Sequence, residues 1–136
     1  MILLDTCAAI WAATDDASLA KRSRDAIAEA ARRGQLYLSA ISAWEIATLV
    51  RRGRLGLQTS PSAFIDRLFS GPGIREYPVD SNVAATAGSL PKDFHGDPAD
   101  RLIVATAVVC GFRLFTRDER ILRYAGRTRA FAAEPC

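Results

Sequence analysis

Short apolar runs alternate with longer helical segments along the whole 136-residue chain. The apolar runs predict strands at residues 2–4, 36–38, 74–79 and 113–116, and a fifth strand at 129–132. The intervening segments carry apolar residues at helical spacing. Strands that alternate with helices form a mostly parallel sheet, because each helical connection returns the chain to the edge where the previous strand began. The chain is therefore expected to form an α/β fold with helices on both faces of the sheet.

Helix start and stop signals divide the stretches between the strands. Helices are expected at residues 8–13, 19–33, 42–50, 61–69, 81–89 and 98–110, with a short helix after Asp118. Ser42 and Glu45 have the spacing of a capping box, in which the serine caps the helix and the glutamate reaches back. Asp97 before Pro98 is typical of an N-cap followed by the first helical position. Residues 90–97 remain as the clearest loop.

The composition describes one folded domain spanning residues 1–136. Hydrophobic residues make up 49% of the chain and charged residues 24%, which is too apolar for a disordered protein. No apolar run reaches the roughly 18–20 residues that a membrane helix needs, so no membrane association is expected. The first residues, Met1 to Leu4, lack the features of a signal peptide and are expected to form a strand.

Cysteine content and charge narrow the setting further. Cys7, Cys110 and Cys136 are odd in number and show no metal-binding spacing, which favours a reducing cytoplasm over a disulfide framework or zinc site. Cys7 and Cys110 are expected to be small buried hydrophobic residues. The net charge of +3 comes almost entirely from arginine. Arginine suits bidentate phosphate contacts, so the charge is compatible with a nucleic-acid partner without proving one.

Four acidic residues stand where an apolar run gives way to a polar stretch: Asp5, Glu45, Asp100 and Asp118. The carboxyl ends of parallel strands and the first turns of the following helices lie on the ligand-binding edge of such sheets. Each acid except Asp5 has an alternative role at a helix start, worth only about 1 kcal/mol. Asp5 directly follows a buried strand, where an isolated charge is costly unless it is paired or coordinated. Together the carboxylates predict a site for Mg²⁺ or Mn²⁺.

Four motifs carry a resemblance to a known family. They are Met1-Ile2-Leu3-Leu4-Asp5-Thr6, Ser39-Ala40 with Ser42-Ala43-Trp44-Glu45, His95-Gly96-Asp97-Pro98-Ala99-Asp100-Arg101, and Thr116-Arg117-Asp118. In this order the chain resembles the PIN-domain family, and most closely the VapC-type toxins of bacterial type II toxin–antitoxin pairs. The resemblance implies a three-layer α/β/α sandwich with a central sheet of four to five strands. It also implies an endoribonuclease dependent on Mg²⁺ or Mn²⁺, a homodimer and a cognate antitoxin that neutralises it.

The resemblance also assigns roles to individual residues. Asp5, Glu45, Asp100 and Asp118 carry over as the catalytic, metal-binding set, with Asp5 and Asp100 as the expected direct ligands. Thr6 and Thr116 are expected to orient carboxylates or water through their hydroxyls. Asp97 is a possible fifth acid, with helix capping as its alternative role.

Two arginines beside the acidic motifs are candidate substrate-binding residues. Arg117 is the stronger candidate for an RNA phosphate, because it precedes Asp118 at the expected edge of the cleft. Arg101 has two alternatives: an ion pair with Asp100 or Asp97, or a phosphate contact. Trp11 and Trp44 are expected to be packing residues, although Trp11 could equally line a dimer or antitoxin groove.

A metal site of this kind predicts a particular chemistry. A bound Mg²⁺ would lower the pKa of a water molecule and stabilise charge on the phosphoryl group, and in-line attack would leave a 5′-phosphate and a 3′-hydroxyl. The only histidine, His95, rules out a ribonuclease of the two-histidine pancreatic type. His95 is expected at the rim of the site, as a loop residue.

Other classes of function share parts of this pattern. A receiver domain would need a lysine after a late strand, where Thr116-Arg117-Asp118 stands. A haloacid-dehalogenase-type phosphatase would need a second aspartate two positions after Asp5, where Cys7 stands. A catalytically silent PIN-like binding module is the remaining alternative, and the presence of all four acids argues against it.

Overall fold

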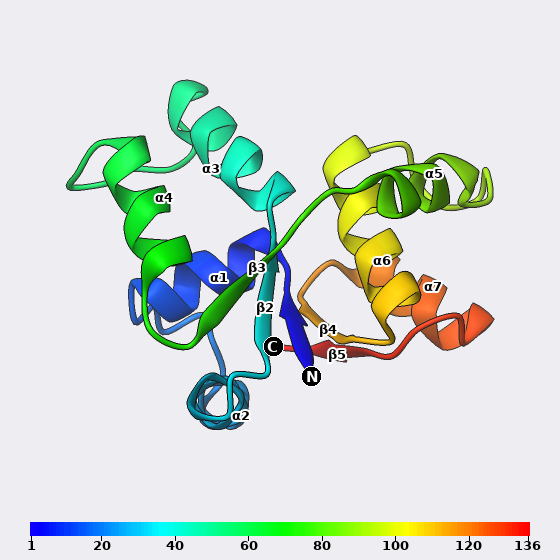
Figure 1. Cartoon of the computed structure of the whole chain (residues 1–136), viewed down its shortest axis with the longest axis horizontal. Helices are drawn as coiled ribbons and strands as arrows, with labels where there is room; N and C mark the ends of the chain where they lie inside the picture. The colour runs from blue at the N-terminus through cyan, green and yellow to red at the C-terminus, as the bar shows by residue number, and fades with distance from the viewer.

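Five strands form one sheet in the order β3-β2-β1-β4-β5 (Figure 1). The computed structural model describes residues 1–136, with strands β1 (Ile2–Leu4), β2 (Leu36–Ser39), β3 (Ile74–Tyr77), β4 (Arg113–Thr116) and β5 (Ala133–Pro135). Every neighbouring pair of strands is parallel. All the carboxyl ends of the strands therefore meet at one edge of the sheet. The predicted α/β fold with a mostly parallel sheet is confirmed.

Seven helices cover the two faces of this sheet in three layers. They are α1 (Thr6–Ala13), α2 (Lys21–Arg32), α3 (Ile41–Arg51), α4 (Pro61–Ser70), α5 (Ser81–Ser89), α6 (Pro98–Cys110) and α7 (Glu119–Thr128). Figure 1 shows α1 to α4 on one side of the sheet and α5 to α7 on the other. None of these helices has the length and apolar character needed to cross a bilayer.

The position of β1 at the centre of the sheet explains why its sequence is uniformly apolar. Ile2 and Leu4 pack against the core formed with α1, α2 and α4, while Leu3 packs on the opposite face against α6 and α7. Successive side chains of a strand point to opposite faces, so a strand covered on both sides buries every residue. The chain leaves β1 toward β2 and later returns to β4 on the other side. Parallel sheets bind ligands at such a switch in strand order.

The last strand differs from its predicted position. It comprises Ala133–Pro135 and not residues 129–132, because α7 continues to Thr128 and Arg129 ends it in the left-handed conformation with φ 54°. Phe131 provided the apolar signal, but it is buried against α6 and α7 and is not part of the strand.

The starts of three helices also differ from the prediction. Helix α1 begins at Thr6, two residues early, because the Asp5 side chain accepts a hydrogen bond from the Ala8 N–H and caps it. Helix α2 begins at Lys21, while Leu19 lies before it and is buried in the core. Helix α3 begins at Ile41 with Ala40 at the N-cap, so the predicted capping box does not form.

Candidate metal-binding site at the carboxyl edge of the sheet

A cavity of about 240 Å³ opens at the carboxyl edge of the sheet. Its walls are formed by Asp5, Thr6, Cys7, Trp11, Glu45, Asp100, Arg117 and Asp118. The four predicted acids thus come together from four separate parts of the chain: the end of β1, helix α3, helix α6 and the turn after β4. The cavity lies where β1 and β4 are neighbours, at the switch in strand order.

Asp5 is the most deeply placed of the four acids. Its side chain caps α1 through the Ala8 N–H at 2.7 Å, and its own N–H donates to the Phe115 carbonyl of β4 at 3.0 Å. Burial raises the pKa of Asp5 above its ordinary value, even though hydrogen bonds from the Thr116 side chain and from the Ala8 and Arg117 backbone lower it. Ionised Asp5 is therefore under-compensated by the protein alone.

Glu45 is held by a hydroxyl and not by its own helix start. The Thr6 hydroxyl donates to Glu45 Oε1, and Thr6 Oγ1 lies 2.9 Å from Ser42 Oγ in a second hydrogen bond. Ser42 is fully buried in the first turn of α3 and anchors Thr6 there. Burial raises the pKa of Glu45, and the charges of Asp97 and Asp5 raise it further, against the lowering effect of the Thr6 hydrogen bond.

Asp100 lies in the first turn of α6, behind the cap that Asp97 provides. Asp97 Oδ1 accepts from the Asp100 N–H at 3.0 Å, so the predicted N-cap forms. Burial, and after it the charges of Asp97, Glu45, Asp118 and Asp5 in that order, together raise the pKa of Asp100 to about 7. No lysine or arginine forms an ion pair with Asp100.

Asp118 differs because it has a cation of its own. It caps α7 by accepting from the Arg120 N–H at 2.7 Å, and Arg120 Nη2 lies 3.1 Å from Asp118 Oδ2. Burial raises the pKa of Asp118, but the hydrogen bonds and charge of Arg120 outweigh it and the net pKa is lowered. Thr116 Oγ1 accepts from the Asp118 N–H at 3.0 Å and also bonds to Asp5, so this threonine links two of the acids.

His95 completes the donor set: it lies in the loop before α6 at the edge of the site, as expected, but its contact with Asp100 was not predicted from the sequence. Its Nε2 lies 3.3 Å from Asp100 Oδ2 and is shielded from solvent, but it has no hydrogen-bond partner in good geometry. Burial lowers the pKa of His95, which favours the neutral ring. Its place two residues before Asp97 in the loop was the only available signal.

Two overlapping groups of donors are close enough to share a cation. Ligand atoms of His95, Asp100 and Asp118 lie within 4.8 Å of one another, and so do those of Glu45, Asp97 and Asp100. Asp100 belongs to both groups, whereas Asp5, which was expected to be a direct ligand, belongs to neither. Carboxylate oxygens are the ligands that Mg²⁺ and Mn²⁺ prefer, and the orphaned His95 nitrogen is a further donor. The residues present therefore fit a divalent cation.

The two arginines of the predicted site have different surroundings. Arg101 points away from the acids and donates to the backbone carbonyls of Ala87, Leu90, Phe94 and His95. The expected ion pair of Arg101 with Asp100 or Asp97 does not form. The carbonyls also use the guanidinium N–H groups that a phosphate would need. Arg117 does line the cavity, where it lies over the Trp11 ring at 5.3 Å and donates to the Ser18 carbonyl.

Two other expectations were wrong. Trp44 is 57% exposed and is not a packing residue, because it lies on the outward side of α3. Cys7 is exposed at the cavity and is not buried, since α1 begins earlier than predicted and turns this position toward the acids. Burial and the surrounding carboxylates raise the pKa of the Cys7 thiol to about 11, so it is a poor nucleophile.

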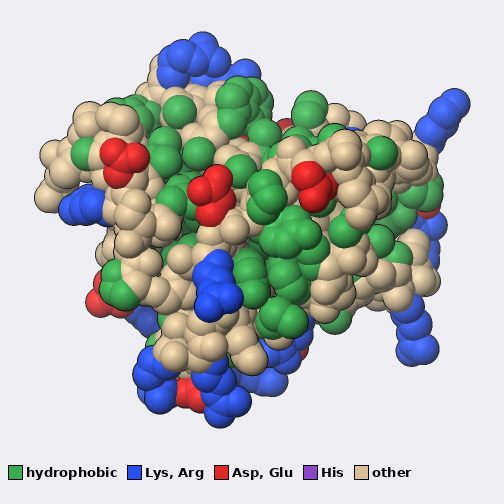
Figure 2. All heavy atoms as spheres, in the orientation of Figure 1, with side chains coloured by type: hydrophobic (Ala, Val, Ile, Leu, Met, Phe, Trp, Pro, Cys, Tyr) green, Lys and Arg blue, Asp and Glu red, His purple; other side chains and the backbone are tan.

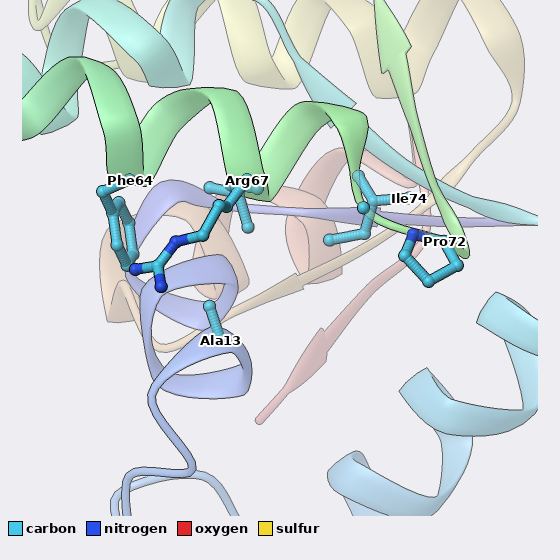
Figure 3. A pocket seen from close by; sticks show the side chains of 7 residues that line it. Ala13, Phe64, Arg67, Pro72 and Ile74 are labelled. Atoms are coloured by element: carbon cyan, nitrogen blue, oxygen red, sulfur yellow. The ribbon is translucent and has the colours of Figure 1, made fainter.

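A second cavity, of about 350 Å³, lies between α1 and the turn that joins α4 to β3 (Figure 3). Phe64, Leu68, Pro72 and Ile74 supply apolar walls, and Arg67 extends across it. No acidic or histidine side chain lines this cavity, so it has no donors for a metal ion. This cavity therefore does not share the metal-binding character of the one at the carboxyl edge of the sheet.

Comparison with known proteins agrees with this geometry. The family model described as PIN domain matches residues 2–127. The chain belongs to the PIN-domain family. It is 38% identical over 120 residues to ribonuclease VapC22 of Mycobacterium tuberculosis, covering 88% of each chain.

Solved structures share the same fold. One is a chain of VapBC2 from Rickettsia felis, solved bound to a DNA fragment from the promoter of these proteins. It aligns with a TM-score of 0.73 and 15% identity over 100% of this chain and 99% of that chain. A chain of DNA-bound VapBC from Salmonella typhimurium aligns with a TM-score of 0.69 and 16% identity over 98% and 96% of the two chains. The three-layer α/β/α fold expected from the four motifs is confirmed.

Proposed function

We propose that this protein is a metal-dependent endoribonuclease and the toxin of a type II toxin–antitoxin pair. One observation carries the proposal: four carboxylates from distant parts of the chain line one cavity, and only Asp118 has an arginine partner. Crowded carboxylates without cations repel one another, and a divalent cation removes that repulsion. The similarity to a VapC ribonuclease supports phosphodiester cleavage as the reaction.

Asp5, Glu45, Asp100 and Asp118 are the residues that would hold the metal, with Mg²⁺ as the cofactor and Mn²⁺ as a substitute. When bound, the metal would lower the pKa of a water molecule and stabilise charge on the phosphoryl oxygens. Cleavage by this water would leave a 5′-phosphate and a 3′-hydroxyl. Oxygen donors alone would favour Mg²⁺, while the nearby His95 nitrogen makes Mn²⁺ acceptable.

The remaining residues of the site position these carboxylates. Thr6 fixes Glu45, Thr116 bridges Asp5 and Asp118, and Asp97 holds the first turn of α6 on which Asp100 stands. Such outer partners commonly set the orientation of metal ligands. Arg117 is exposed at the cavity wall and is the residue we assign to a substrate phosphate. Arg101 supports the loop before α6 and has no substrate role in this proposal.

The proposed partners follow from the relatives. The structurally similar VapBC proteins from Rickettsia felis and Salmonella typhimurium are complexes. A cognate antitoxin that neutralises this protein in the cytoplasm is therefore part of the proposal, and RNA is its substrate. The homodimer expected from the motifs remains a prediction.

The alternative classes fit the geometry less well. Neither lysine lines the acidic cavity: Lys21 pairs with Asp25 on α2, and Lys92 is exposed in the loop before α6. A receiver domain needs a lysine in contact with its phosphoryl group, so this class is disfavoured. A silent binding module would have no need for four carboxylates around one cavity, three of them with pKa values raised mainly by burial.

Cleavage of RNA by the purified protein, free of antitoxin, tests the proposal. We expect endonucleolytic cleavage of structured RNA with Mg²⁺ or Mn²⁺, no cleavage with EDTA, and loss of activity in Asp5→Asn. Asp66→Asn is a matched control, because Asp66 is an exposed acid on α4 outside the cavity. Equal cleavage by the Asp5→Asn and Asp66→Asn proteins would exclude this site as the catalytic centre.

A further inference from the structure

Three arginines lie along one side of helix α7, next to the acidic cavity. Arg120, Arg123 and Arg127 are spaced by three and four residues, which places them on the same face of a helix. They line a cavity of about 360 Å³ together with Asp93, Phe94, His95 and Tyr124. At 1.5 Å per residue the row is about 10 Å long. We call these three arginines and the cavity beside them the α7 shelf.

The α7 shelf is continuous with the proposed metal site. Arg120 at one end of the row contacts Asp118 at 3.1 Å. His95 lines the shelf and also lies 3.3 Å from Asp100 across the boundary. The surface therefore changes from negative to positive within one turn of α7. An RNA strand with one phosphate at the acids would therefore have its next phosphates over the arginines.

The floor of the shelf is aromatic, but it is closed to bases. Phe94 and Tyr124 are only 2% and 6% exposed and pack edge to face at 4.9 Å. The guanidinium of Arg127 lies 5.5 Å over the Tyr124 ring, with 61% of the arginine side chain exposed. Stacking of a nucleic-acid base needs an open ring face. What the shelf offers outward is a row of guanidinium groups, which bind phosphate and carry no sequence preference of their own.

The present partners of these arginines are weak enough to be exchanged. Arg127 pairs with Asp93 at the surface, and Arg123 donates only to the Glu119 carbonyl of its own helix. Exposed ion pairs of this kind are worth about 0–1 kcal/mol, so a phosphate can compete for the same guanidinium groups. Arg120 contacts a carboxylate that the proposed metal would also engage, which would leave this arginine available to the substrate.

We propose that the α7 shelf binds the backbone phosphates of the RNA strand on one side of the bond that is cleaved. The proposal rests on the proposed ribonuclease function and adds the path of the substrate. A length of about 10 Å corresponds to about three stacked nucleotides at 3.4 Å each. The strand thus lies along α7 and is held by charge, and any sequence preference arises elsewhere on the protein.

The test measures RNA binding separately from cleavage. The double variant Arg123→Gln/Arg127→Gln is made in the Asp5→Asn background, and its affinity for a fluorescein-labelled single-stranded oligouridylate is followed by fluorescence anisotropy over a range of monovalent salt. The matched control is Arg32→Gln/Arg33→Gln in the same background. These two arginines end α2 just before β2, at the amino edge of the sheet, where Figure 2 shows basic side chains at the bottom of the view.

The shelf variant is expected to lose two phosphate contacts. Each contact with a single strand contributes about 0.7 to the slope of log affinity against log salt, so the slope should become shallower by about 1.4. The same relation gives an affinity loss of about 25-fold near 0.1 M salt. The control should stay within about twofold of the parent protein, and Arg123→Lys/Arg127→Lys should restore most of the affinity because the salt-dependent part of binding depends on the charge.

Two results would overturn the shelf. One is an equal loss of affinity in the shelf and control variants, which would mean that net charge alone attracts RNA. The other is unchanged affinity and slope in the shelf variant. Cleavage by the wild-type protein and its loss with EDTA test the proposed ribonuclease function independently. Failure of the RNA-binding proposal for the α7 shelf can therefore be distinguished from failure of the ribonuclease proposal. Circular dichroism of each variant confirms folding, which the exposure of all four arginines favours.

Discussion

The acidic cavity has two sides that differ in how their charge is compensated. On the inner side, Asp5, Glu45 and Asp100 have raised pKa values with burial as the largest cause, and none pairs with a lysine or arginine. On the outer side, Arg120 pairs with Asp118 and lowers its pKa against the effect of burial. The protein supplies a cation to one side and leaves the other without one. The difference locates the need for a metal on the inner side.

Local geometry explains why the inner side lacks a cation although arginines are near in sequence. Arg101 directly follows Asp100, but adjacent residues of a helix do not face each other, so its guanidinium turns to the carbonyls of the preceding loop. Arg117 precedes Asp118 and is held over Trp11 by the Ser18 carbonyl. Arg120 meets Asp118 because the aspartate caps the helix on which the arginine stands.

The largest expected effect comes from neutralising one acid on each side. Asp5→Asn should reduce RNA cleavage by more than about 100-fold, beyond the 10–100-fold typical of residues that only support metal ligands. Asp118→Asn should cost about tenfold, because this carboxylate is already compensated and asparagine keeps the helix cap. Cleavage rates at saturating Mg²⁺ compare them. A larger loss in Asp118→Asn would reverse the assignment of the two sides.

Metal addition should stabilise the folded protein through the inner side. A ligand present at about 100 times its dissociation constant adds about 2.7 kcal/mol to the free energy of unfolding. We expect Mn²⁺ to raise the melting temperature of the wild-type protein by several degrees, and to leave that of Asp5→Asn nearly unchanged. Differential scanning fluorimetry with a metal titration measures this. An equal shift in both proteins would place the metal elsewhere.

A smaller effect is expected from the hydroxyl that holds Glu45. Thr6→Val keeps the shape of the side chain but removes its hydrogen bond to Glu45, and should lower cleavage about tenfold with little change in folding. Thr14→Val is the control, because Thr14 donates only to the Ile10 carbonyl at the end of the same helix. If the two valine variants retain the same activity, Thr6 does not position Glu45.

The smallest effect concerns pH in the metal-free protein. The pKa of Asp100 is raised from 3.8 to about 7 in the folded state, so the folded protein binds this proton more tightly than the unfolded chain. The contribution of Asp100 to stability is full below about pH 4 and is lost as the pH rises toward 7.

In EDTA, the free energy of unfolding should therefore fall between about pH 5 and pH 7.5, by on the order of 1 kcal/mol once solvent screening is included. Urea unfolding at the two pH values measures the fall. Asp100→Asn should show a smaller fall, and an equally steep dependence in this variant would assign it to other groups.

The backbone elements of this protein could be predicted from local sequence patterns. Uniformly apolar runs such as residues 2–4 identified the strands, since a parallel strand covered on both faces buries every side chain. Pro98 and Gly111 bounded α6 as expected, because each acts on its own backbone position. The acids Asp5 and Asp118 could be placed at the carboxyl edge because Asp5 directly follows β1 and Asp118 lies two residues after the end of β4.

The contacts between side chains, in contrast, followed from the packing of the fold. Ser42 anchors Thr6 and does not cap α3, Arg101 turns away from Asp100, and His95 approaches it, since each depends on elements distant in sequence. The α7 shelf likewise became visible only once the loop carrying Phe94 lay beside α7. Local signals fix backbone conformation within a few residues, whereas side-chain partners depend on how helices pack across the sheet. The four acids could be identified from the sequence, but the unequal compensation of their negative charges could not.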